Sequence, residues 1–193
     1  MNKIYRHFFL LLIVLPPVCT SASELKSGEF SPPRMAPDFR LQGSNGKEIK
    51  LTDYRGKVVP LGFGFTSCPE VCPTTLAELT SVRKQLGISA QDFQVVYVTV
   101  DPERDTAKVM QEYVTAFDPS FIGVTGTAAQ LAEMRRQYGI TAVKTRPNSA
   151  GSYGVDHSSV VFLIDKAGKL RALSPYGRSV DDMVHDVRTL LDN

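Results

Sequence analysis

The chain has 193 residues, of which 42% are hydrophobic and 22% are charged. These values are typical of one globular domain with a sizeable core. Removing Lys3 and Arg6, which we place in a leader, from the 22 basic residues leaves as many basic as acidic side chains. A neutral body argues against nucleic-acid binding through phosphate contacts, and three cysteines are too few for a disulfide-rich scaffold.

The first 22 residues have the pattern of an export signal. Lys3 and Arg6 precede an apolar run over residues 8–18, which is shorter than the ~20 residues of a membrane span. Small residues follow, and we expect cleavage after Ala22. Alternatively, the leader stays uncleaved and anchors the protein in the membrane. The protein is therefore expected to be exported to a periplasm, with a tether to the inner membrane if the leader stays.

Residues 23–36 are polar and contain prolines, and we expect a linker or an extended arm there, followed by a single domain over residues 37–193. The domain begins with a hairpin signal, Asn45-Gly46, between the extended segments 38–41 and 48–51. The apolar run 57–65 predicts a buried strand, although its Pro60 cannot donate to a strand ladder.

The remaining elements alternate between helices and strands. We predict helices over 73–86, 106–117, 127–139 and from 179 onward, and strands over 93–100, 158–164 and 169–174. Asp105 is expected to cap the second helix, and Thr127 with Gln130 to form a capping box on the third. Residues 141–156 have the composition of a long mobile loop. This order indicates an α/β fold, with a central mixed sheet flanked by helices on both faces.

The most informative segment is residues 66–75, which join a buried strand to a helix. Cys68 and Cys72 are four positions apart, so both thiols can face one point at the start of that helix. Pro73 suits the first helical position, which places Cys72 where the helix dipole favours a thiolate and lowers the thiol pKa. A purely structural disulfide is disfavoured, because so small a loop constrains little chain entropy. Redox chemistry and metal binding both remain open.

His157 is the second candidate, just before a predicted buried strand. A lone histidine is more often packed or solvated, as we expect of His185 on the last helix. Two thiolates and an imidazole would make a soft donor set that suits Cu(I) or zinc. Structural zinc usually takes four protein ligands, so the set favours Cu(I). The spacing alone does not bring His157 to the cysteines.

Several motifs, taken together and in order, resemble the SCO/SenC family of copper-binding, thioredoxin-like proteins. They are Ala36–Phe39, Tyr54–Val59, Gly64–Thr75, Val100–Thr106, Phe121–Gly126 and Val155–Ser159. The resemblance implies a thioredoxin-like fold, with the hairpin as an N-terminal extension. It also implies that Cys68, Cys72 and His157 bind one copper ion, and that the loop 101–105 lies near that site. Cu(I) is the expected state. A further Cu(II) state would take Asp156 or water as an additional ligand.

The resemblance implies a monomeric metallochaperone that assembles the binuclear copper site of cytochrome c oxidase. Its partner would be the copper-bearing subunit of that oxidase or another copper chaperone. The alternative is an enzyme, a thiol–disulfide reductase that keeps the copper-site cysteines of the oxidase reduced, with Cys68 attacking and Cys72 resolving. A metallochaperone is favoured, because His157 stands where thioredoxin-like reductases place a proline. A peroxiredoxin-type peroxidase comes last, because Pro69 replaces the threonine of that motif.

Overall fold

A computed structural model of the chain describes residues 25–87, 91–149 and 151–193, and the expected leader over 1–22 lies outside them. Eight strands of the described residues form one sheet in the order β1-β10-β9-β4-β5-β6-β2-β3. Their bounds are Gly28–Met35 (β1), Arg40–Gly43 (β2), Glu48–Lys50 (β3), Val59–Gly64 (β4), Val96–Thr99 (β5), Ile122–Thr125 (β6), Val160–Ile164 (β9) and Lys169–Pro175 (β10). A separate ribbon pairs β7 (Ala142–Lys144) with β8 (Val155–His157).

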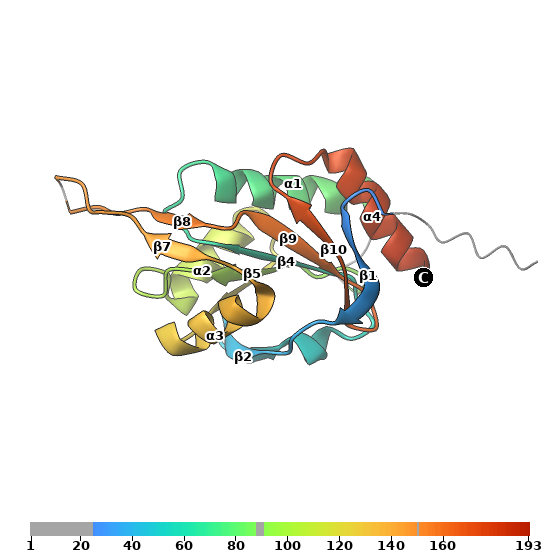
Figure 1. Ribbon diagram of the computed structural model, residues 1–193, viewed down its shortest axis with the longest axis horizontal. Coiled ribbons are helices and arrows are strands. Elements are labelled where there is room, and N and C mark those ends of the chain that lie inside the picture. Colours follow the sequence, from blue (N-terminus) through green and yellow to red (C-terminus); the bar gives the residue numbers. More distant parts are fainter. Residues whose placement is uncertain (1–24, 88–90, 150) are drawn as a thin grey trace, which may run out of the picture.

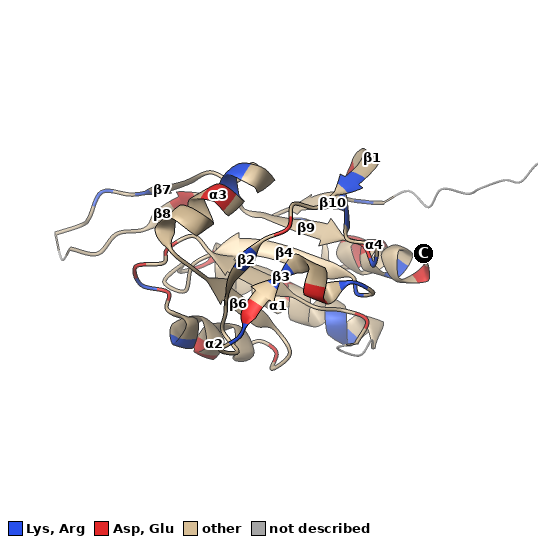
Figure 2. Cartoon of the chain, turned by 90° about the horizontal axis from the view of Figure 1, so that it is seen from below, with Lys and Arg blue, Asp and Glu red and all other residues tan. Residues whose placement is uncertain are grey.

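The helices cover both faces of this mixed sheet. They are α1 (Val71–Leu86), α2 (Ala107–Thr115), α3 (Ala128–Tyr138) and α4 (Val180–Asp192), with a short 3-10 helix at Leu51–Tyr54. Figure 2 shows α3 on one side of the sheet and α1 and α2 on the other, and α4 packs along α1 (Figure 1). Strands β4, β5 and β6 are parallel, whereas β9 is antiparallel to β4. The predicted α/β class with a mixed sheet is confirmed.

Local signals in the sequence place most helix ends correctly. Gly87 and Gly139 end α1 and α3 in the left-handed conformation, with φ of 60° and 69°. Thr127 and Gln130 form the expected capping box. The cap of α2 is a correction: Thr106, not Asp105, accepts from the amide of Val109. Asp105 is fully buried, and its carboxylate is engaged elsewhere.

Three segments form strands that their composition did not predict. Strand β6 follows α2 and precedes α3 in the chain. It packs closely on α2, because a Cβ added to Gly123 would lie 2.9 Å from the Cβ of Met110. The expected linker contains β1, which pairs with β10. The expected mobile loop contains β7 and β8. Strands β6, β7 and β8 have only 4, 3 and 3 residues, and β1 contains two prolines and no apolar alternation, so only their pairing partners identify these segments as strands.

The hairpin and the proline-containing strand also differ in detail from expectation. The hairpin is not an appendage, because β2 pairs with β6 and so extends the main sheet. Pro60 lies in the central strand β4. Strand β5 begins only at Val96, beyond an isolated bridge between Val58 and Phe93. The gap in the pairing of β4 with β5 lies opposite Pro60, because proline has no N–H to donate to the neighbouring strand.

The core fills both sides of the sheet. On the side of α3, the ring of Tyr138 packs against the rings of Phe63 and Phe162. Met110 of α2, Met134 of α3 and Met183 of α4 are buried in this core. Across the described part of the chain, no helix combines the length and apolar character needed to cross a membrane.

Candidate metal centre

Cys68 and Cys72 lie where β4 passes into α1. Cys68 is in the connecting loop and is half-buried, whereas Cys72 is the second residue of α1 and only 1% exposed. Both are free thiols. The amide N–H of Cys72 donates to the sulfur of Cys68 over 3.4 Å. The helix begins two residues earlier than predicted, so Pro73 is its third residue rather than its first.

Tyr97 of β5 lies beneath the thiols, and the sequence analysis did not identify it. Its ring covers two glycines of β4: a Cβ on Gly62 would lie 2.8 Å from the ring, and one on Gly64 would lie 2.0 Å from the hydroxyl oxygen. The same added Cβ on Gly64 would lie 2.8 Å from the sulfur of Cys72. Two glycines at alternate positions of a buried strand were the available signal, because they mark a close approach by another group.

Burial, rather than the helix dipole, decides the protonation of Cys72. Removal from water raises the pKa of its thiol from 9.0 to about 12, even though a hydrogen bond with Tyr97 lowers it. Desolvation disfavours the charged thiolate. The expected lowering of the Cys72 pKa is therefore wrong for the metal-free protein. Burial also raises the pKa of Tyr97 well above its usual value, which keeps its hydroxyl protonated as a donor.

His157, on β8, meets Cys72 directly. Its Nε2 lies 3.6 Å from the sulfur of Cys72, and its Nδ1 lies 3.0 Å from the carbonyl oxygen of Ser158. A carbonyl only accepts, so Nδ1 carries the hydrogen and the Nε2 lone pair faces the sulfur. Burial lowers the pKa of His157, which favours the neutral imidazole. The ring is held edge-on to Phe65, with centroids 5.9 Å apart.

The three predicted ligands therefore differ in how they are placed. Cys72 and His157 are in contact through the Cys72 sulfur and the His157 Nε2. The sulfur of Cys68 accepts a hydrogen bond from the Cys72 amide and so lies next to Cys72. Within the described ranges, no three histidine, cysteine or acidic side chains already stand in a metal-binding arrangement. An open groove borders Cys68, His157 and the exposed Asp156. The groove gives the site access to solvent on this side.

The acidic loop after β5, residues 101–105, holds the segment that leads to Cys68. The Asp105 carboxylate accepts from the amide and hydroxyl of Thr66 at 3.1 and 2.6 Å, and from the hydroxyl of Thr99 at 2.6 Å. Asp101 is buried and pairs with Arg104 of the same loop. His185 is part-exposed on α4, as predicted, and contacts Asp186. It is not brought to the thiols.

Fold and site define a thioredoxin-like protein with a thiol pair and an imidazole at the start of its first helix. A profile of the SCO1/SenC family matches residues 28–192. The chain therefore belongs to the SCO1/SenC family. An SCO2-like protein of Rickettsia prowazekii is 37% identical over 132 residues, which are 68% of this chain and 64% of that protein. The chain thus spans less than two thirds of that relative's length.

Solved structures agree with this fold. The copper-bound ScoI of Arabidopsis thaliana is 31% identical, with a TM-score of 0.76 over 82% of this chain and 99% of that chain. BsSco, described as a member of the Sco family of cytochrome c oxidase assembly proteins with a disulfide switch, is 25% identical. Its TM-score is 0.65, over 82% of this chain and 94% of that chain.

Proposed function

We propose that this protein binds one copper ion, as Cu(I), through Cys68, Cys72 and His157, and passes it to the thiols of an acceptor protein. The main observation in support is the contact of the His157 Nε2 lone pair with the Cys72 sulfur at 3.6 Å. Cys68 lies beside them. Two thiolates and an imidazole form the soft donor set that Cu(I) prefers. Structural relatives solved with copper support this choice of metal.

The acceptor in this proposal is the copper-bearing subunit of cytochrome c oxidase or another copper chaperone. Membership of the family supports an oxidase-related partner. The protein acts as an exported monomer, in a periplasm. A Cu(II) state would complete its coordination with water or with Asp156 at the rim of the groove.

The geometry also suggests how the cargo leaves. Cys72 is buried, whereas Cys68 and His157 both border the open groove. An acceptor thiolate entering through the groove meets those two ligands first. Binding of Cu(I) releases the thiol protons, and transfer returns them, so affinity rises with pH while the thiols titrate.

A second function, reduction of a partner disulfide, rests on a different observation. Cys68 is the more exposed of the two thiols, its sulfur accepts from the Cys72 amide, and in this reading its thiolate is the attacking group. That thiolate attacks the partner disulfide and expels one partner thiolate. Cys72 then resolves the mixed disulfide, so two electrons and two protons pass to the partner while Cys68 and Cys72 become a disulfide. The same oxidation would remove two copper ligands.

The deciding experiment is an anaerobic titration of the reduced protein with Cu(I) against a competing chelator. We expect one copper per chain, with affinity reduced in Cys68→Ser, Cys72→Ser and His157→Ala. His185→Ala is the matched control, because that histidine lies on α4 and contacts Asp186. Full affinity in His157→Ala would contradict the three-ligand site. Copper-independent reduction of a disulfide-bonded acceptor peptide, lost in Cys68→Ser, would favour the reductase.

A further inference from the structure

His157 ends β8, a strand outside the main sheet, three residues before β9 of that sheet begins. Strands β7 and β8 form a ribbon of their own, in which Ala142 pairs with His157 and Lys144 with Val155. The ribbon extends away from the body beside the site (Figure 1). An isolated two-stranded hairpin is marginally stable at best in water. The contacts that hold this ribbon to the body therefore decide where His157 stands.

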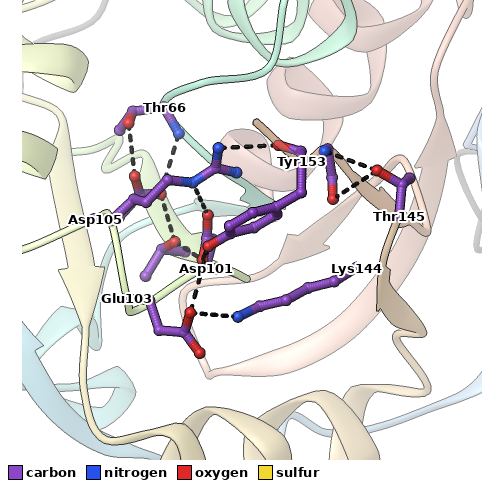
Figure 3. A network of polar contacts seen from close by, with 10 residues as sticks. Thr66, Asp101, Glu103, Asp105, Lys144, Thr145 and Tyr153 are labelled. Atoms are coloured by element: carbon purple, nitrogen blue, oxygen red, sulfur yellow. Dashed lines mark hydrogen bonds and ion pairs between the residues drawn. The ribbon is translucent and has the colours of Figure 1, made fainter. Parts of the chain in front are cut away.

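Those contacts centre on Tyr153, four residues before His157, and on the loop after β5 (Figure 3). The guanidinium carbon of Arg104 lies 3.9 Å from the Tyr153 ring centroid, and Arg104 Nη1 donates to the Tyr153 carbonyl oxygen over 3.0 Å. The Tyr153 hydroxyl donates to Oδ1 of Asp101 over 3.0 Å, and Nε of Arg104 pairs with Oδ2 of Asp101. Asp101 is fully buried, so its carboxylate joins ribbon and body in a place shielded from solvent.

A second contact lies at the solvent side of the same tyrosine. Lys144 of β7 pairs with Glu103 at 2.5 Å, and its ammonium lies 4.9 Å from the Tyr153 ring centroid. The side chains of Lys144 and Glu103 are 44% and 69% exposed. Exposed ion pairs contribute little to stability, so the shielded contacts to Asp101 and Arg104 hold Tyr153 more strongly than the Lys144–Glu103 pair holds β7.

The same arginine connects the ribbon to the metal ligand. Its guanidinium carbon lies 5.7 Å from the Phe65 ring centroid, and Phe65 packs edge-on against the His157 ring. Arg104 thus contacts both Tyr153, at the hairpin-loop end of the ribbon, and the Phe65 ring that packs against His157. A shift of the ribbon away from Arg104 would also move His157 away from Cys72.

We propose that Asp101, Arg104 and Tyr153 form a clamp that positions His157 for the metal, and that opening of this clamp releases His157. The inference rests on the proposed copper function. All three are positioning residues, because they act on the metal through the ribbon and Phe65. Loss of His157 leaves a two-coordinate thiolate site, which an acceptor thiol can enter. The strength of the clamp therefore sets the rate of copper release.

The first test needs no metal and uses Tyr153→Phe, which keeps the ring but removes its hydrogen bond to Asp101. The readout is hydrogen exchange at the amides of Thr145 and Ser158, which donate to the carbonyls of Gly154 and Thr141. We expect exchange to accelerate by up to about tenfold, the equivalent of one lost hydrogen bond. The exposed Arg146→Ala, on the same hairpin, is the control and should exchange as the wild type does. Unchanged exchange in Tyr153→Phe would overturn the clamp.

The second test measures the rate of Cu(I) loss to a chelator in the wild-type and His157→Ala backgrounds. Tyr153→Phe should accelerate loss several-fold in the wild type and have no further effect without His157. Equal acceleration in both backgrounds would overturn the positioning role, because the substitution would then act on the thiols or on the whole fold. If the wild-type protein binds no Cu(I), the proposed function fails, and hydrogen exchange alone then confirms or overturns the clamp.

Discussion

Asp105 offers a direct test of how the loop carrying the thiols is held. Its carboxylate is fully buried and accepts three hydrogen bonds, two of them from Thr66. Thr66 lies two residues before Cys68, at the point where β4 has ended. We expect Asp105→Ala to destabilise the fold and to loosen the thiol loop.

The size of the effect follows from the groups left behind. The Thr66 amide loses its acceptor, and an unsatisfied buried donor costs ~1–3 kcal/mol. The hydroxyls of Thr66 and Thr99 lose charge-assisted bonds but can rotate toward other acceptors. Relief from burying a carboxylate offsets part of the loss. We therefore expect the free energy of unfolding to fall by about 3 kcal/mol, or Tm by about 6–12 °C for a domain of this size.

The assay is urea and thermal unfolding of the reduced, metal-free protein, followed by the Cu(I) titration. Asp105→Asn is the matched variant, because its amide oxygen can still accept from the Thr66 amide and the Thr99 hydroxyl. It should retain more stability and more copper affinity than Asp105→Ala. If Asp105→Ala unfolds within ~0.5 kcal/mol of the wild type, the range of an ordinary surface substitution, the reasoning is refuted.

Three further predictions concern the surroundings of Cys72 and the segment that precedes β1. Because the pKa of Cys72 is raised from 9.0 to about 12, its protonated thiol favours the fold below pH 9. The free energy of unfolding should then fall between pH 9 and 12, by at most ~1.4 kcal/mol per pH unit, and urea unfolding of Cys72→Ala should lack this component of the slope. Gly64→Ala places a Cβ 2.0 Å from the Tyr97 hydroxyl and 2.8 Å from the Cys72 sulfur. It should lower stability by about 1–3 kcal/mol and weaken Cu(I) binding; wild-type values in both assays would contradict the close packing. Asp186 is buried and accepts from the amides of Lys26 and Ser27 at 2.6 and 2.8 Å. Asp186→Ala should expose that segment to limited proteolysis, detected by mass spectrometry, and an unchanged cleavage pattern would show that other contacts hold it.

The sequence by itself determined the elements whose signals are local. The Asn45-Gly46 hairpin, the Thr127 capping box and the glycine ends of α1 and α3 all form as predicted. Each depends on hydrogen bonds or backbone angles within a few residues, so neighbouring side chains suffice to specify it. The thiol pair also follows from local spacing, and the ordered motifs identified the family.

Only the tertiary structure decided which distant groups meet. His157 is 85 positions from Cys72, and their contact depends on a ribbon that its composition marked as a loop. Strand β1 and the place of Tyr97 under Gly64 likewise depend on pairing and packing partners. Periodicity reports that a segment is apolar or alternating, but it does not name the surface that the segment will contact.

Cys72 shows the difference most clearly. Its position in the first turn of a helix is a local property, and the helix dipole there would lower the pKa of its thiol. Its burial against Tyr97 and His157 comes from strands elsewhere in the chain. Desolvation of the thiolate outweighs the dipole, so the pKa rises instead. The direction of that shift was decided by packing, because the free energy of hydrating a charge depends on everything that surrounds it.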